Sequence, residues 1–203
     1  MKGVPIMIKK NTKTDPENDK NYLTVEEFNT IRRMNLPKDF LDFLEIGFRT
    51  GLRTADILNL KKENIVLTKN GDGSLTERIH GTALKTKSQT PINIRLDQKS
   101  LSILKDRLDN TKSDFLFANR SGNPYTVEYF KKYFRKAFDQ LCPDMKLHKS
   151  IHAIRSGNRK FLEMYSVNHS EIDFRQCLTI YGPTYTYMAE QSASVNAINK
   201  YLK

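Results

Sequence analysis

The sequence predicts a mainly α-helical domain with a small antiparallel β-sheet near its start, which is an α+β fold. Apolar residues recur at helical spacing over most of the chain, and strand-like pieces flank a lysine-rich turn between residues 75 and 96. Glycine or proline separates the predicted elements. With 203 residues, the chain is long enough to bury one sizeable core.

The first 21 residues differ in composition from the rest of the chain. They carry prolines, lysines and asparagines without a sustained hydrophobic period, which is typical of a linker or of a truncated N-terminal region. They also contain no apolar core of a signal peptide. We therefore expect one folded domain over residues 22–203.

The first helices of this domain are set by a cap, a proline and a glycine. Thr24 and Glu27 have the spacing of a capping box, so a helix begins there, and Pro37 ends that stretch. A strongly apolar helix over residues 40–48 then stops at Gly51. Later helices are expected over residues 55–60, 99–108, 127–141, 151–165 and 192–202. Strands are expected over residues 64–67, 78–81 and 90–94.

Charge and composition narrow the class of partner. Lys and Arg number 34 against 23 Asp and Glu, so the net charge is +11. Such an excess suits a polyanion, because each neutralised phosphate releases counterions. No apolar run approaches the roughly 18 residues that cross a bilayer, and no GxxxxGK[ST] motif for a nucleotide is present. Because Cys142 and Cys177 cannot form a disulfide framework, a reducing cytoplasm is the expected location.

Two short motifs contain candidate phosphate-binding residues. Arg53 lies on a tight connection between two predicted helices, where its planar fork can present two N–H groups to one phosphate. His152 and Arg155 are three residues apart and share one helical face. Taken singly, each motif also fits a solvated turn or helix surface. His148 and His152 are four residues apart, but no acidic third ligand follows the zinc-protease pattern, so no metal site is expected.

In this order, the segments resemble the catalytic domain of the tyrosine recombinases, the phage-integrase family. The resemblance covers about residues 22–203 and includes a "yLTxEE" start, a "TGLRxxExxxL" box with Asp56 in place of Glu, a hairpin lysine, and an "HxLR" box with Ile154 in place of Leu. A segment like the family's "lF…G…plt" lies between the two boxes, in Phe115–Phe117, Gly122 and Pro124–Thr126.

The resemblance implies the tyrosine-recombinase catalytic-domain fold and a defined chemistry. A tyrosine hydroxyl attacks a DNA phosphodiester, leaving a 3′-phosphotyrosine link and a free 5′-hydroxyl, so no metal or nucleotide cofactor is expected. The implied partner is double-stranded DNA, bound at paired sites by a homo-tetramer. The implied setting is the cytoplasm and nucleoid of a bacterial, phage or mobile-element host cell.

The resemblance also implies roles for single residues. Arg53 and Arg155 would clamp the phosphate, and His152 would be their acid/base partner. The general acid would be Lys85, with Lys87 as the alternative, because the "KTx…P" spacing before Pro91 fits Lys85 better. We expect further DNA contacts from Thr86, Lys87 and Arg159.

The nucleophile is expected about thirty residues beyond the second arginine and before a final helix. Tyr187 lies 187 − 155 = 32 residues beyond Arg155, and Tyr185 is the next candidate. Tyr201 lies inside the terminal helix, where an aromatic packing role is the better interpretation.

One family position is not matched. The family places "LGH" about nine residues before the tyrosine, whereas this chain reads QCLTIYG over residues 176–182 and has no His or Trp after His169. Leu178 occupies the position on a gapless count, so either Tyr181 substitutes or the site lacks one member. This departure leaves a second interpretation open, a recombinase-fold DNA-binding regulator with weak or no cleavage activity.

Overall fold

The computed structural model describes residues 21–202 except 70–72, 85–89, 144–148 and 177–190. Its helices are α1 (Val25–Ile31), α2 (Lys38–Thr50), α3 (Thr54–Leu58), α4 (Gln98–Asn110), α5 (Val127–Leu141), α6 (Ala153–Met164), α7 (His169–Arg175) and α9 (Ser192–Tyr201), with one 3-10 turn, η1 (Lys62–Asn64). Its strands are β1 (Ile65–Lys69), β2 (Leu75–Thr82) and β3 (Pro91–Arg95). This arrangement confirms the mainly α class with a small antiparallel sheet. Within these ranges no helix is both long and apolar enough to cross a membrane.

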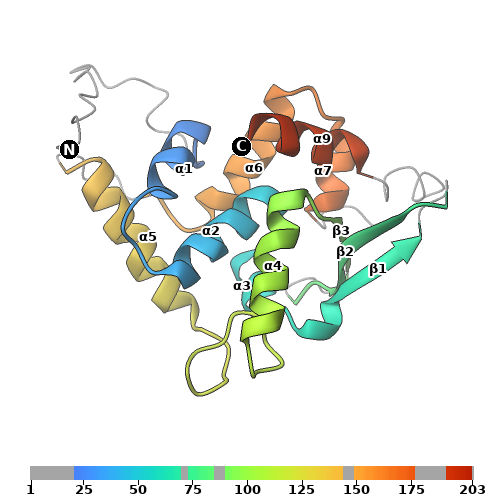
Figure 1. The fold of residues 1–203 in the computed structure, drawn as a ribbon. Coiled ribbons are helices and arrows are strands. Elements are labelled where there is room, and N and C mark those ends of the chain that lie inside the picture. Colours follow the sequence, from blue (N-terminus) through green and yellow to red (C-terminus); the bar gives the residue numbers. More distant parts are fainter. Residues whose placement is uncertain (1–20, 70–72, 85–89, 144–148, 177–190, 203) are drawn as a thin grey trace, which may run out of the picture.

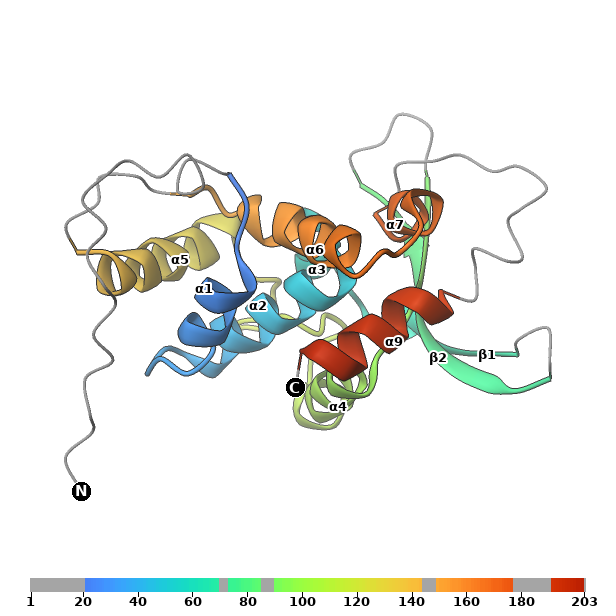
Figure 2. The same cartoon turned by 90° about the horizontal axis from the view of Figure 1, so that it is seen from above.

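Helix α2 is the centre of the core (Figure 1). The view from above shows α5 and α6 on one side of it and α4 on the other (Figure 2). Ten of its thirteen residues are buried, as expected for a helix covered on several sides. Aromatic pairs fix its neighbours: Phe43 lies 4.3 Å from Phe130 of α5, and Phe48 lies 4.3 Å from Phe28 of α1 between ring centroids.

Helices α2 and α6 approach each other closely at Gly47. A Cβ atom at this position would lie only 2.9 Å from Cγ2 of Ile154, so a larger residue would push the helices apart. The contact matters for the site, because α2 leads into the turn with Arg53 and α6 carries Arg155.

The three strands form one antiparallel sheet in the order β1-β2-β3, at the right of Figure 1. Ile79 pairs with Ile65 on one side and with Ile94 on the other, and Ile79 and Ile94 are completely buried. Beyond the β2–β3 ladder the main chain of Ala83 donates to Thr90 at 2.9 Å. This bond closes the base of the connection that contains Lys85 and Lys87.

The C-terminal helix α9 is held by a buried arginine. Arg49 is 2% exposed and contacts Glu45 at 2.6 Å, Asp97 at 3.0 Å and the carbonyl oxygen of Leu202 at 2.5 Å. It thereby joins α2, the N-cap of α4 and the end of α9, and its charge is balanced by two carboxylates.

Candidate phosphate-binding site

Arg53 stands on the turn that follows α2. Gly51 ends the helix in the left-handed conformation, with φ of 71°, and its N–H donates to the carbonyl oxygen of Gly47 at 3.0 Å. A side chain at position 51 would also collide with Asn158. Arg53 is then the N-cap residue of α3, and its side chain is 21% exposed. The glycine thus lets the chain reverse and place this arginine at the surface between two helices.

Asp56 lies one turn beyond Arg53 and is almost fully buried. Its Oδ2 lies 3.8 Å from Nη1 of Arg53, an ion pair beyond hydrogen-bond distance. Neither atom has a hydrogen-bond partner within the described part of the chain, although both are buried. Such atoms are rare in folded proteins. Nη1 of Arg53 and Oδ2 of Asp56 can therefore each form a further hydrogen bond. We call the turn that carries these two side chains the Arg53 corner.

The other carboxylate oxygen of Asp56 holds the end of the sheet. Oδ1 accepts a hydrogen bond from the main chain of Leu84 at 3.0 Å. Leu84 is the residue directly before Lys85, so the described chain leads from the Arg53 corner to the expected general acid. Lys85, Thr86 and Lys87 themselves lie outside the described residues.

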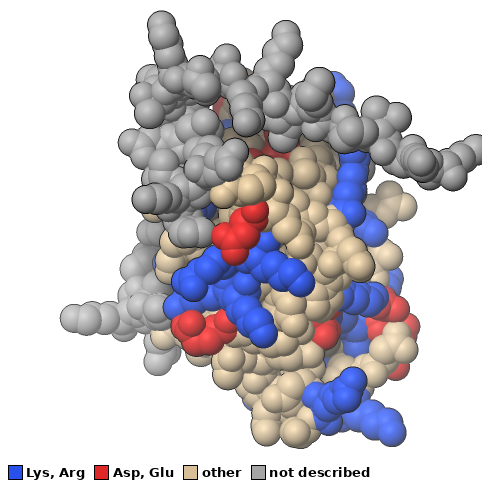
Figure 3. Space-filling model, turned by 90° about the vertical axis from the view of Figure 1, so that its left-hand side faces the viewer, with Lys and Arg blue, Asp and Glu red and all other residues tan. Residues whose placement is uncertain are grey.

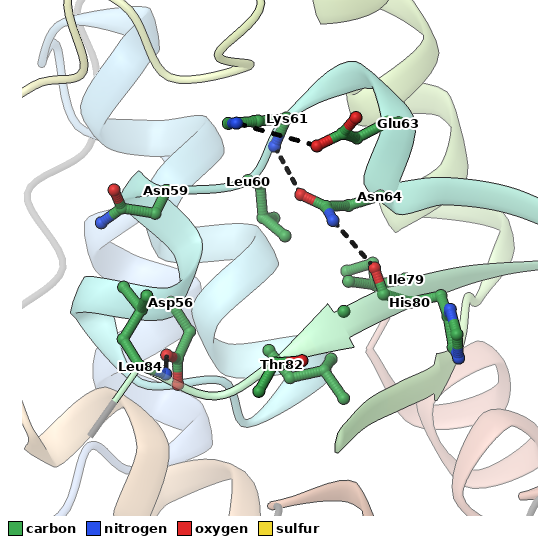
Figure 4. Close-up of a pocket in the computed structure, with 12 residues that line it drawn as sticks. Asp56, Asn59, Leu60, Lys61, Glu63, Asn64, Ile79, His80, Thr82 and Leu84 are labelled. Carbon is green, nitrogen blue, oxygen red and sulfur yellow. Dashed lines mark hydrogen bonds and ion pairs between the residues drawn. The ribbon is translucent and has the colours of Figure 1, made fainter. Parts of the chain in front are cut away.

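A small cavity lies between α3, η1 and β2, and Asp56 and Leu84 are among the residues that line it (Figure 4). Asp56 and Leu84 lie at one end, and Lys61 and Asn64 lie at the other. The Asn64 amide joins the walls: it accepts from the main chain of Lys61 at 2.8 Å and donates to the carbonyl oxygen of His80 at 2.9 Å. With a volume of about 170 Å³, the cavity is smaller than typical ligand sites, and we interpret it as a structural joint.

Arg155 reaches from α6 to the same turn. Its Nη1 donates to the carbonyl oxygen of Gly51 at 2.6 Å, and its Nη2 donates to the carbonyl oxygen of Gln176 at 2.5 Å. Gly51 is two residues before Arg53, so residues 104 positions apart in the sequence are bonded at one corner. The structure therefore brings together the two segments whose arginines the sequence selects.

His152 occupies the position before α6, three residues before Arg155, and is exposed. Its carbonyl oxygen accepts from the main chain of Ser156 at 3.1 Å, so it belongs to the first turn of the helix. This first turn places the imidazole and the guanidinium on one end of α6.

Arg159, expected to contact DNA, lies one turn further along α6. Its Nε lies 2.9 Å from Glu163, and its Nη1 lies 2.6 Å from Asp173 of α7. Hydrogen bonding to Asp173 raises the pKa of Arg159. The side chain thus links α6 to α7, and contact with DNA stays a prediction.

Tyr187, Tyr185, Tyr181 and Leu178 lie outside the described residues, but both flanks of their segment are described. On one flank, the carbonyl oxygen of Gln176 contacts Arg155. On the other, the buried Gln191 has a φ of 50°, and its Oε1 accepts from Nη1 of Arg175 at 2.7 Å. Arg175 is fully buried, and this burial lowers its pKa to about 10. The chain before residue 177 and the chain after residue 190 are therefore hydrogen-bonded to each other through Arg175 and Gln191. This contact lies next to Arg155, which is bonded to the adjacent Gln176.

Sequence reasoning missed two buried amides, Asn158 and Gln176. Both are less than 5% exposed and both contact the elements that carry the arginines. A signal for the first was available, because Asn158 is polar within an otherwise apolar helical face that includes Ile154, Phe161 and Leu162. Nothing in the sequence identified Gln176 as its partner.

Comparisons with known proteins identify the family and the fold of this chain. The family model "Phage integrase family" matches residues 23–164. The catalytic core of lambda integrase is 16% identical, with a TM-score of 0.60 over 78% of this chain and 95% of that chain. The Tn1549 transposon integrase in complex with a circular intermediate DNA is 15% identical, with a TM-score of 0.55 over 88% and 63%.

A further similar structure is the XerH site-specific recombinase bound to its difH substrate in a pre-cleavage complex. It is 20% identical, with a TM-score of 0.55 over 84% of this chain and 50% of that chain, so this chain spans about half of its length. A search among curated proteins found no match. At these identities the solved structures establish the fold, and the family model covers well over half of the sequence. The chain belongs to the phage integrase family.

Proposed function

We propose that this chain is the catalytic domain of a tyrosine-type site-specific DNA recombinase. The observation that carries the proposal is the contact between Arg155 and the carbonyl oxygen of Gly51, which joins the two arginine-bearing segments at one corner. Arginines on two adjoining segments suit a phosphodiester, whose transition state carries extra negative charge. The exposed His152 lies on the same helical turn as Arg155 and can add a hydrogen bond or a proton.

In the proposed reaction, the hydroxyl oxygen of Tyr187 attacks the scissile phosphorus and passes its proton to His152, the acid/base partner. The bond between phosphorus and the 5′-oxygen breaks, and Lys85 donates a proton to that leaving oxygen. Arg53 and Arg155 stabilise the charge on the non-bridging oxygens, and His152 assists by hydrogen bonding or proton transfer. The phosphotyrosine link conserves the energy of the broken bond, so the reverse steps can join a new 5′-hydroxyl.

The exposed face of α5 supports DNA as the partner. Figure 3, which faces the left-hand side of Figure 1, shows Lys and Arg side chains gathered in one patch with acidic side chains at its edges. The exposed basic residues of α5 are Lys131, Lys132, Arg135 and Lys136. The four cations lie on two successive turns of α5, and such a basic patch attracts the phosphates of DNA.

The test is covalent trapping on a nicked duplex that carries sequence from the DNA flanking the gene. After cleavage close to the nick, the short 5′-hydroxyl fragment diffuses away, and the adduct persists on a denaturing gel. Wild type is expected to form the adduct, and Tyr187→Phe is expected to form none. An adduct from Tyr187→Phe that disappears in Tyr185→Phe would move the nucleophile to Tyr185.

A second candidate, a DNA-binding regulator on the same fold, is favoured by one observation: no His or Trp follows His169. Such a protein would shift the duplex on a native gel in a salt-sensitive, site-specific way. It would form no adduct on the trap substrate, so the same pair of gels separates the two functions.

A further inference from the structure

The guanidinium of Arg155 is held in place by two main-chain carbonyl oxygens. One belongs to Gly51 on the turn after α2, and the other belongs to Gln176 at the end of α7. Its position therefore depends on how these two segments sit against α6. Side chains that fix this packing control where the guanidinium points.

Asn158 fixes the end of α2 against α6. It is completely buried, and it lies three residues after Arg155 on the same helix. Its Nδ2 donates to the carbonyl oxygens of Phe48 at 2.8 Å and Arg49 at 3.4 Å. These carbonyls lie in the last turn of α2, where helix geometry leaves oxygens without intrahelical partners. The amide thus caps the helix that leads into the Gly51 turn.

Gln176 fixes the end of α7 against the same point. It is 3% exposed, and its Nε2 donates to the carbonyl oxygen of Arg155 at 3.1 Å and to Oδ1 of Asn158 at 3.2 Å. Its own carbonyl oxygen accepts from the Arg155 guanidinium. Gln176 therefore contacts Arg155 at both the main chain and the side chain, and the Gln176 amide is bonded to the amide that caps α2.

We propose that Asn158 and Gln176 are positioning residues that act through Arg155. Together they set the guanidinium against the Gly51 turn and so set the spacing of the two arginines at a bound phosphate. The inference rests on the proposed function for its catalytic consequence, whereas the positioning itself is a property of the free protein. Neither amide is expected to touch DNA, because both are buried.

The variants Asn158→Leu and Gln176→Met keep the approximate shape and length of each side chain and remove its hydrogen bonds. Asn64→Leu is the matched control, since its amide also joins two elements but lies at the η1–β2 joint. On the nicked trap substrate, the single-turnover cleavage rate is expected to fall about 10- to 100-fold in the two positioning variants, as for a misplacement of the order of 1 Å. The control is expected to cleave at the wild-type rate, and DNA affinity is expected to be the same in all four proteins.

A double-mutant cycle separates positioning from a general loss of structure. If Gln176 acts through Arg155, then Gln176→Met causes no further loss of rate in an Arg155→Ala background. Additive losses would overturn the inference, because they would show that the amide affects cleavage by another route.

A second readout does not depend on cleavage. With 15N-labelled arginine, the two Nη atoms of Arg155, assigned by comparison with Arg155→Lys, are expected to give separate signals, because two carbonyls slow rotation about Cζ–Nη. The signals should merge in Asn158→Leu and Gln176→Met, and unchanged spectra would contradict the positioning. If wild type forms no adduct, the proposed function fails, and the spectra still decide whether these amides hold Arg155.

Discussion

Replacing Asp56 by alanine tests whether this carboxylate stabilises two places at once. One is the turn with Arg53, and the other is the start of the connection between β2 and β3 that contains Lys85. The change removes the acceptor for the main chain of Leu84, a charge-assisted hydrogen bond of 3.0 Å, worth about 1.5–3 kcal/mol. It also leaves Arg53 without its carboxylate at 3.8 Å. Because the two atoms are 3.8 Å apart and form no hydrogen bond, we place that loss at about 1 kcal/mol. The free energy of unfolding should fall by about 3 kcal/mol.

For a domain of this size, such a loss lowers the unfolding midpoint by about 6–12 °C, measured by circular dichroism or calorimetry. Asp56→Asn is the control, because an amide oxygen still accepts from Leu84 and only the charge is lost. Its midpoint should fall by about 2–4 °C. Equal midpoints for the two variants would refute the claim that the Leu84 bond is the larger contribution. A wild-type midpoint for Asp56→Ala would refute both roles of Asp56.

Three further predictions concern the site, the DNA-binding face and acid stability. His152→Ala should slow cleavage of the trap substrate about 100-fold or more, as expected for a lost acid/base group, with DNA affinity unchanged in a gel shift. The double variant Lys132→Ala, Arg135→Ala should reduce the slope of log affinity against log salt concentration by about 2; an unchanged slope would exclude this face of α5 from phosphate contact. Hydrogen bonding to Lys160 lowers the pKa of Glu163 below its ordinary 4.5. Its stabilising contribution is therefore present above about pH 4.5 and is lost as the pH falls, so Glu163→Gln should flatten the acid limb of a plot of unfolding midpoint against pH.

Helices whose ends are marked by local capping residues were predicted from the sequence. The predicted helix over residues 127–141 coincides with α5, because Thr126 caps it and its apolar residues keep one face. The expected capping box is present as well, with Thr24 and Glu27 bonded reciprocally at 3.2 Å and 2.8 Å.

Elements that depend on tertiary contacts were not predicted. Helix α7 has only seven residues, and its buried side chains include the charged Glu171 and Arg175. These side chains bond to α9 and to the end of α2, through the main chain of Ser194 at 2.7 Å and of Arg49 at 2.9 Å. Short polar helices of this kind have no periodic signal of their own. Their formation depends on partners that are distant in the sequence.

The residues of the candidate site divide in the same way, into those in local motifs and those defined by tertiary contacts. Arg53, His152 and Arg155 were predicted because each lies in a short motif of recognisable chemistry. The amides of Asn158 and Gln176 were not, since their role arises from hydrogen bonds between α2, α6 and α7. Sequence motifs thus indicate candidate phosphate-binding groups, whereas the packing of helices determines how these groups are held.

The most direct test of the shared arginine corner compares wild type, Arg53→Ala and Arg155→Ala on the nicked trap substrate at saturating DNA. The measured quantity is the rate at which the covalent adduct appears on a denaturing gel. If the two arginines form one phosphate site, each variant should lose at least about 100-fold in that rate, while a gel shift still shows site-specific binding. An adduct that forms at the wild-type rate in either variant would contradict the account, because that arginine would then lie outside the phosphate site.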